Sequence, residues 1–252
     1  MRSEHIVRSF DDELQQIENL VTKMGGMVEL QISNATISLV ERDIDLGEQV
    51  RADDKKIDAL EAEIDTAVVR VLALRQPAAQ DLRAVVAVLK ISTNLERIGD
   101  YAKNIAKRSS VIGEFRHIGA SANIIKRMSA LVQVMLKDAL DAHVSRNVAL
   151  ADDVRMRDDE VDQMHNTLFR ELLTYMMEDA RNITPCMHLL FIAKNVERMG
   201  DHVTGIAEQI HYVVSGSLPG DERPKSDVTS LIAITPNDGD RADDDSNDGS
   251  RE

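Results

Sequence analysis

The sequence predicts an all-α protein of six long helices, arranged as two tandem three-helix bundles related by internal duplication and followed by a disordered acidic tail. Aromatic residues make up only 3% of the chain and Trp is absent, whereas β-sandwiches and barrels rely on aromatic and β-branched residues. Apolar residues make up 43% and recur at helical spacing. The motif Asn94–Asp100 (NLERIGD) returns as Asn195–Asp201 (NVERMGD), 101 residues later.

The duplication extends beyond this motif. Asp54 and Asp58 have counterparts in Asp158 and Asp162, at an offset of 104 residues. Because the offset falls from 104 to 101 by the second motif, the connection between the second and third helices must be three residues shorter in the second half. Apolar positions that agree at the larger offset include Met24 and Met128, Val28 and Val132, and Ala35 and Ala139.

Each half reads as three helices. Pro77 and Pro185 each lie near a first helical turn, where proline is tolerated. Gly113 and Gly119 bracket the join between the halves. This join is short, so the two bundles should pack against each other or share an elongated axis. The helices are expected at 4–44, 48–75, 78–112, 118–146, 150–180 and 184–215.

These breaks divide the chain into a first bundle at 1–115, a second bundle at 116–216 and a tail at 217–252. The tail is rich in Gly, Pro, Asp and Ser and contains ten acidic and four basic residues. A segment of this composition cannot bury enough apolar surface to offset the entropy lost on folding. We therefore expect a disordered, solvated extension.

Charge and cysteine content exclude several classes of protein. The net charge of −14 and the pI near 4.9 argue against nucleic-acid binding, which needs a basic surface. The single cysteine, Cys186, cannot form an intrachain disulfide and fits the reducing cytoplasm. The sequence also lacks a signal peptide and any run of about 18 apolar residues, the length a spanning helix needs. A membrane role is therefore expected only through a partner.

Each half carries two acidic pairs. Acids four residues apart share one face of a helix, so the second, third, fifth and sixth helices each present one pair. Consecutive helices joined by a short loop run antiparallel, which places the two pairs of a bundle at matching heights. The acids expected to meet are Asp54, Asp58, Glu96 and Asp100 in the first bundle, and Asp158, Asp162, Glu197 and Asp201 in the second.

Four carboxylates gathered in one place repel one another unless some are protonated or a multivalent cation lies among them. Oxygen ligands suit iron, magnesium, manganese or calcium, and zinc fits less well. Gly99 and Gly200, at matched places within the two motifs, suggest close helix approach or a need for room beside the aspartate. The alternative is a solvated charge stripe in which Arg97 and Arg198 pair with the acids along their own helices.

The sequence predicts no enzyme. A ferritin-like di-metal oxidase needs histidine three residues after the motif glutamate, but these positions are Gly99 and Gly200. No nucleophile elbow, P-loop or Rossmann fingerprint is present, and Cys186 has no catalytic context.

The chain resembles the PhoU family of phosphate-transport accessory and regulatory proteins over nearly its whole length to about residue 215. The resemblance rests on four motifs: Leu74–Pro77 (LRQP) followed by Asp81–Arg83 (DLR), Leu95–Asp100 (LERIGD), Leu173–Asp179 (LTYMMED) and Val196–Asp201 (VERMGD).

This resemblance implies metal ions bound by the eight acids named above and a cytoplasmic homodimer or larger oligomer without catalytic activity. It implies negative regulation of the phosphate-starvation response and restraint of phosphate uptake. The implied partners are the phosphate-sensing histidine kinase and the ATPase subunit of the phosphate ABC transporter. Two alternatives stay open, a metal-storage or detoxification protein and a metal-free helical adaptor.

Overall fold

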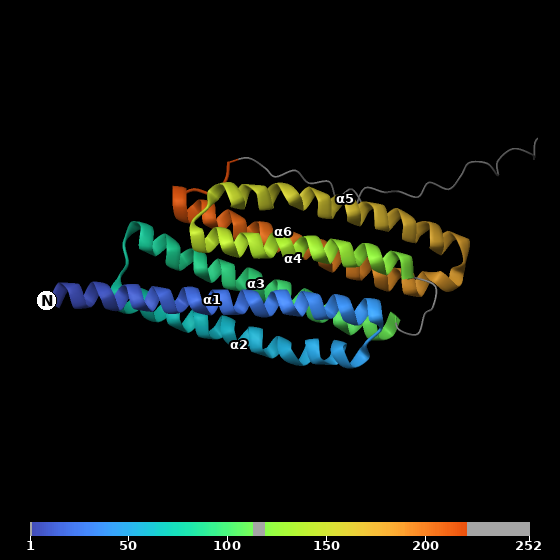
Figure 1. The fold of residues 1–252 in the computed structure, drawn as a ribbon, viewed down its shortest axis with the longest axis horizontal. Helices are drawn as coiled ribbons and strands as arrows, with labels where there is room; N and C mark the ends of the chain where they lie inside the picture. The colour runs from blue at the N-terminus through green and yellow to red at the C-terminus, as the bar shows by residue number, and fades with distance from the viewer. Residues whose placement is uncertain (1, 113–118, 221–252) are drawn as a thin grey trace, which may run out of the picture.

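The computed structural model describes residues 2–112 and 119–220, with side chains described at 10–112 and 121–220. Over these ranges the chain is all-α, as predicted (Figure 1). Its elements are α1 (Arg2–Glu41), α2 (Ile44–Arg75), α3 (Ala79–Ile112), α4 (Gly119–Ser145), α5 (Val148–Glu178), the short 3₁₀ helix η1 (Ala180–Asn182) and α6 (Ile183–Ser215).

The helices form two three-helix bundles that lie side by side along their length (Figure 1). The first bundle consists of α1, α2 and α3, and the second of α4, α5 and α6. Helix α3 packs against α6 and helix α1 against α4, whereas α2 and α5 lie on the outside. Of the two arrangements expected, bundles that pack against each other and bundles that share an elongated axis, the structure therefore shows the first.

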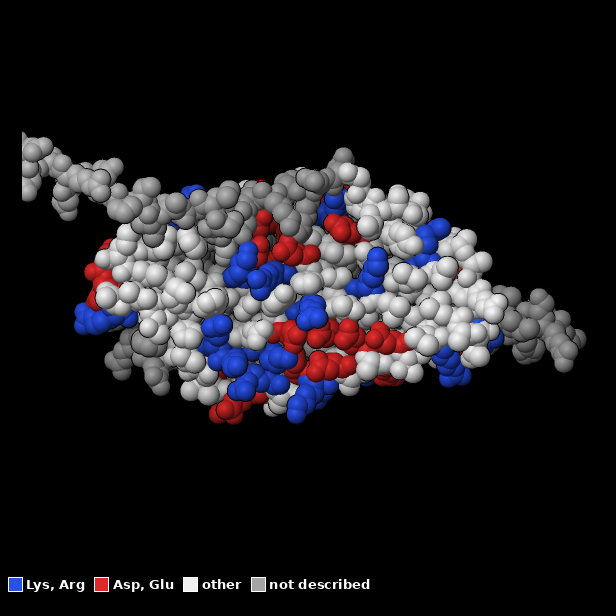
Figure 2. Space-filling model, turned by 180° about the vertical axis from the view of Figure 1, so that it is seen from behind, with Lys and Arg blue, Asp and Glu red and all other residues white. Residues whose placement is uncertain are grey.

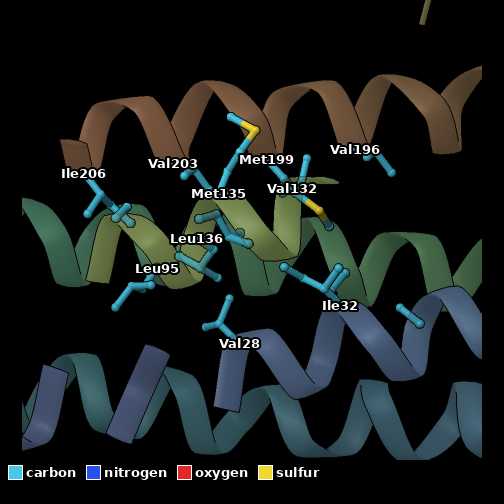
Figure 3. Close-up of a cluster of buried hydrophobic side chains, with 14 of the residues drawn as sticks. Val28, Ile32, Leu95, Val132, Met135, Leu136, Val196, Met199, Val203 and Ile206 are labelled. Carbon is cyan, nitrogen blue, oxygen red and sulfur yellow. The ribbon is translucent and has the colours of Figure 1, made fainter. Parts of the chain in front are cut away.

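One apolar core runs through both bundles. Its centre is formed by side chains from α1, α3, α4 and α6, which meet between the bundles (Figure 3). These helices bury continuous stripes of Ile, Leu, Val, Ala and Met, so that neither bundle closes its apolar surface alone. Fully buried members drawn there include Ile32, Leu95, Val132, Met135, Val196 and Met199.

The first connection of each bundle has the same geometry in both halves. Arg42 and Arg146 are counterparts, and both adopt left-handed backbone, with φ of 59° and 54°. Each is followed by an N-cap, Asp43 or Asn147, whose side-chain oxygen accepts a hydrogen bond from the N–H three residues later. These caps explain why the first helix ends at Glu41 and not at 44, and why the second and fifth begin before 48 and 150.

The second connection, from α2 to α3 in the first bundle and from α5 to α6 in the second, differs between the two halves. In the first half, Gln76 adopts left-handed backbone with φ of 49° and three residues separate α2 from α3. In the second half, Asp179 caps α5 and also accepts a hydrogen bond from the N–H of Arg181 within η1. In the alignment of the repeats Arg75 matches Asp179 and Ala79 matches Ala180, so the residues 76–78 have no counterpart. The connection itself is not shorter, because residues 179–182 separate α5 from α6 whereas 76–78 separate α2 from α3. The prediction of a shorter loop is therefore wrong, since α6 begins at Ile183, the counterpart of Leu82 within α3.

The predicted boundary between the bundles at 115/116 lies outside the described residues, as does the predicted tail from 221 onward. Every described helix falls short of the apolar length that would let it cross a membrane.

Candidate functional site

The predicted acids lie on α2 and α3, which pack against each other, and on α5 and α6, which also pack against each other. We call Asp54, Asp58, Glu96 and Asp100 the first acidic cluster, and Asp158, Asp162, Glu197 and Asp201 the second acidic cluster. On the face opposite to that of Figure 1, acidic side chains form a short row with Lys and Arg beside it, and further acidic groups lie apart from this row (Figure 2).

A lysine lies inside the first acidic cluster. Lys103, one turn beyond the motif on α3, donates hydrogen bonds from its Nζ to Asp100 Oδ1 at 2.5 Å and to Asp54 Oδ2 on α2. Partial burial opposes the charged form of Lys103, but its hydrogen bonds to Asp100 and Asp54 raise its pKa. The ammonium therefore stays charged and joins α2 to α3 through two carboxylates.

The other oxygen of Asp54 is held from α1. The buried side chain of Gln31 donates from Nε2 to Asp54 Oδ1 at 3.2 Å and lies near the carbonyls of Val50 and Gly99. Asp54 is itself buried, with its residue 3% exposed, so its charge needs these donors. All three helices of the first bundle therefore meet at one carboxylate.

The remaining acids of the first acidic cluster are close enough to perturb one another. Burial and the nearby Asp100 carboxylate raise the pKa of Glu96 to about 7. Burial, followed by the charge of Asp54, raises the pKa of Asp58. Arg97 Nε lies 3.6 Å from Glu96 Oε2, and Arg97 Nη1 lies 3.8 Å from Asp100 Oδ2. Such pairing along one helix is what the alternative of a solvated charge stripe predicts. The charges of these four residues are thus linked pairwise, and Lys103 and Arg97 lie beside them.

The second acidic cluster is built on different neighbours. Asp158, Asp162 and Glu197 are buried and Asp201 is partly buried. Lys194 pairs with Glu197 at 2.9 Å along α6. A Cβ on residue 200 would lie 2.5 Å from Asp158 Oδ1, so glycine makes room for this carboxylate.

The donor chemistry of both clusters suits a hard cation, because all eight predicted residues offer carboxylate oxygens. Within the described residues, however, no group of three or more His, Cys, Asp or Glu side chains is arranged so that it could hold a metal ion. Bound metal therefore stays a prediction, and it would require the carboxylates to turn toward the ion.

The sequence reasoning missed Lys103 and Gln31. Spacing could have revealed Lys103, because it lies three residues after Asp100 and shares its face. Gln31 could have been found from the duplication, since its counterpart at the offset of 104 is the apolar Met135. A polar residue in one copy of an otherwise apolar stripe points to a buried partner.

Comparison with known proteins agrees with this architecture. A family model described as the PhoU domain matches the chain twice, at residues 21–109 and 125–210. A "Phosphate-specific transport system accessory protein PhoU homolog" of Caulobacter vibrioides is 48% identical over 228 residues, which cover 90% of this chain and 99% of the relative. The protein of the same description from Rhizobium meliloti is 43% identical over 92% of this chain and 98% of its own.

Solved structures show the same fold. The crystal structure of PhoU from Pseudomonas aeruginosa superimposes with a TM-score of 0.80 at 38% identity, covering 82% of this chain and all of that one. The phosphate transport system regulatory protein PhoU from Streptococcus pneumoniae superimposes with a TM-score of 0.76 at 27% identity, covering 83% of this chain and 99% of the other.

Proposed function

The chain belongs to the PhoU family, and on this basis we propose that it is an accessory protein of phosphate transport that represses the phosphate-starvation response when phosphate is plentiful. The observation that carries the proposal is the match of both repeats to the family model, together with relatives of that description aligned over about nine tenths of this chain. Fold alone would not support a function.

We further propose that the chain is a cytoplasmic adaptor without catalytic activity. Cys186 supports this view, because it is buried and its burial raises the pKa of the thiol, which disfavours a nucleophilic thiolate. The proposed partners are the phosphate-sensing histidine kinase and the ATPase subunit of the phosphate transporter. Long rigid helices with charged faces suit such a bridging role.

A reporter of phosphate starvation tests the regulatory role. Alkaline phosphatase activity would be measured in phosphate-rich medium, in cells with the gene and in cells without it. We expect the deletion to switch the reporter on and the wild-type gene to switch it off again. An unchanged reporter in the deletion strain would contradict the proposal.

We propose that the acidic clusters bind iron, magnesium or manganese, with zinc as a weaker fit. Asp100→Asn and Asp201→Asn should lower the metal bound per chain, measured by elemental analysis, while the helical circular dichroism stays unchanged. Asp141→Asn is the control, because Asp141 is exposed on α4 and pairs only with Lys137 among the contacts described, at 3.2 Å. A large excess of metal per chain would instead favour storage, and unchanged metal in both variants would contradict these sites.

A homodimer is proposed for the assembled state. Light scattering after size-exclusion chromatography measures the mass of the particle in solution. A mass near twice the 28.0 kDa of the chain is expected, and a monomer over the whole concentration range would contradict it.

A further inference from the structure

We propose that two copies of this chain associate through the groove between α1 and α2, with their α2 helices antiparallel and the two Ala59 residues facing each other across a two-fold axis. The inference rests on the homodimer proposed above and names the face that forms it. It assigns this face to the first bundle alone, although the second bundle is built from the same repeat.

The groove lies beside α2, on the outside of the first bundle, where this helix packs against α1 and α3 (Figure 1). A hollow of about 820 Å³ lies between α1 and α2, with Ile17 and Leu20 in the wall from α1 and Ala59, Ala62 and Thr66 in the wall from α2. These three side chains of α2 are short and exposed, so a second helix can approach its backbone closely. Such a helix would remove apolar surface of the groove from water.

The second bundle bridges the equivalent position with polar side chains. Ile17 and Ala67, which line the hollow, have counterparts in Ser121 and Glu171, and the Ser121 hydroxyl donates a hydrogen bond of 2.9 Å from α4 to Glu171 on α5. Longer residues also replace the short ones, with Gln163, Asn166 and Arg170 at the positions of Ala59, Ala62 and Thr66. The first bundle therefore has an apolar hollow where its copy has side chains that join the two helices.

The same difference recurs further along the two helices. A smaller hollow of about 120 Å³ between α1 and α2 has Leu30, Asn34 and Asp53 in its walls, and Leu30 is 61% exposed. Asn34 and Asp53 have counterparts in Asp138 and Arg157, which form an ion pair of 2.6 Å between α4 and α5. Two hollows therefore follow one another along α1 and α2, and an apolar side chain beside them stays exposed.

The exposed face of α2 is complementary in charge to a second copy of itself. Lys55 lies four residues before Ala59 and Glu63 four residues after it, while Glu48 and Arg70 lie eleven residues before and after it. All five residues are exposed, and steps of four and eleven residues return to the same face of a helix. An antiparallel copy centred on Ala59 therefore places Lys55 opposite Glu63 and Glu48 opposite Arg70, each pair twice.

Short side chains separate the charged pairs on this face. Ala52 and Thr66 lie seven residues before and after Ala59 and are also exposed, so they meet between the charged pairs. Within the described residues, neither Lys55 nor Glu63 forms an ion pair in its own chain, so both charges are available to a second copy. Complementary charges fix the orientation and register of an interface, and a contact between identical faces closes as a dimer.

Helix α5 does not have this pattern of charges. The positions of Glu48, Lys55, Glu63 and Arg70 are taken there by Asp152, Asp159, Thr167 and Thr174. An antiparallel copy of α5 would place each of these acids opposite a threonine. Charge complementarity therefore selects α2, and with it the first bundle, as the face for a second copy.

Ala59→Cys in the purified full chain tests the position of the axis. Two thiols that face each other across a two-fold axis can form a disulfide, whereas the native Cys186 is buried. After mild oxidation, non-reducing electrophoresis should show Ala59→Cys as a covalent dimer. Gln163→Cys is the matched control, because it places a thiol at the counterpart position on the exposed face of α5, and it should stay monomeric on the gel, as should the wild type.

Charge reversal tests the antiparallel register. Glu63→Lys and Lys55→Glu each bring like charges together in both copies of the pair, so the Kd of the dimer, measured by sedimentation, should rise by about tenfold or more. The double variant Lys55→Glu/Glu63→Lys restores opposite charges and should return the Kd to that of the wild type. Thr167→Lys changes the counterpart position on α5 and should leave the Kd unchanged. Circular dichroism would show that each variant stays helical.

The outcomes separate this inference from the proposed homodimer. A wild-type dimer whose Kd is unchanged in both single variants, with no disulfide in Ala59→Cys, overturns the inference and leaves the homodimer standing. Equal cross-linking of Ala59→Cys and Gln163→Cys overturns the assignment to the first bundle, and single variants that the double variant does not rescue overturn the antiparallel register. A wild-type chain that is monomeric at every concentration contradicts both the homodimer and the inference.

Discussion

Tyr101 and His202 occupy the same position in the two repeats, and their rings pack against each other with centroids 5.6 Å apart. Each directly follows the last aspartate of its motif. Helices α3 and α6 run antiparallel here, since the start of one lies beside the end of the other in Figure 1. The contact therefore marks a pseudo-two-fold axis, and both acidic motifs lie beside it.

A hydrogen bond across this axis should be energetically coupled. His202 Nδ1 lies 2.8 Å from Asn94 Oδ1, so the imidazole N–H donates to the amide oxygen. We expect Asn94→Ala and His202→Ala each to lower the free energy of unfolding by about 1–2 kcal/mol. In urea unfolding, the double variant should lose less than the sum, by about 1 kcal/mol. Simple additivity would show that the bond contributes nothing.

The two motif glycines and one remote glycine allow a matched test of crowding. In Gly200→Ala the new methyl would lie 2.5 Å from Asp158 Oδ1, so the buried carboxylate must move. We expect a loss of about 1–3 kcal/mol in the free energy of unfolding. The methyl of Gly99→Ala would instead meet Ile57 Cδ1 at 3.2 Å, the end of a flexible side chain, and should cost less.

Gly26→Ala is the control for helix propensity. A Cβ at this position on α1 has no neighbour within 4 Å, so alanine should stabilise the helix by up to about 1 kcal/mol. Thermal unfolding would be measured for all three variants. Equal stabilisation by Gly26→Ala and Gly200→Ala would contradict the crowding of Asp158.

The buried Gln31 should stabilise the folded chain through its hydrogen bond to Asp54. Gln31→Met introduces the residue found at the counterpart position, Met135, and nearly conserves volume. It removes the N–H that lies 3.2 Å from Asp54 Oδ1 and leaves a buried carboxylate with one donor fewer. We expect the free energy of unfolding to fall by about 1–3 kcal/mol. No loss in urea unfolding would mean that water replaces the amide.

Much of the fold could be predicted from the sequence because duplication and helical spacing agree. The repeated motifs gave two equal units, and apolar periodicity placed each helix to within a few residues of its observed ends. The errors fall at the caps, since Asp43 and Asn147 end the preceding helix and start the next within a turn that polarity alone does not reveal. Which bundle faces pack together also had to come from the structure.

The acidic clusters were predicted less completely. Spacing identifies which carboxylates share a face, and in the first acidic cluster Asp58 lies close enough to Asp54 and Asp100 for their charges to interact. It does not show what neutralises them, because Lys103 and Gln31 come from outside the repeated motifs and Gln31 comes from a third helix. Side-chain partners between distant helices depend on tertiary packing, which one sequence does not display.

His143 should make the protein sensitive to acid. It is buried at the end of α4, with Arg146 Nη1 3.4 Å from its Nδ1, and Arg146 also bonds Glu18 on α1 at 2.8 Å. Burial, and then the charge of Arg146, lowers the pKa of His143 from 6.5 to about 4. Between these values the unfolded chain binds a proton that the folded chain does not, so stability falls as the pH drops through this window.

The contribution of His143 to this pH dependence can be measured by replacing it with the residue at the equivalent position of the first repeat. The counterpart of His143 is Leu39, which is also buried, so His143→Leu places a tolerated apolar residue there. Urea unfolding from about pH 7 to about pH 4 should show a shallower decline for His143→Leu, with the difference approaching about 3 kcal/mol at the acid end. All other groups are common to both proteins, so their contributions cancel in this difference. Parallel profiles would show that His143 is protonated as easily in the folded chain as in the unfolded one.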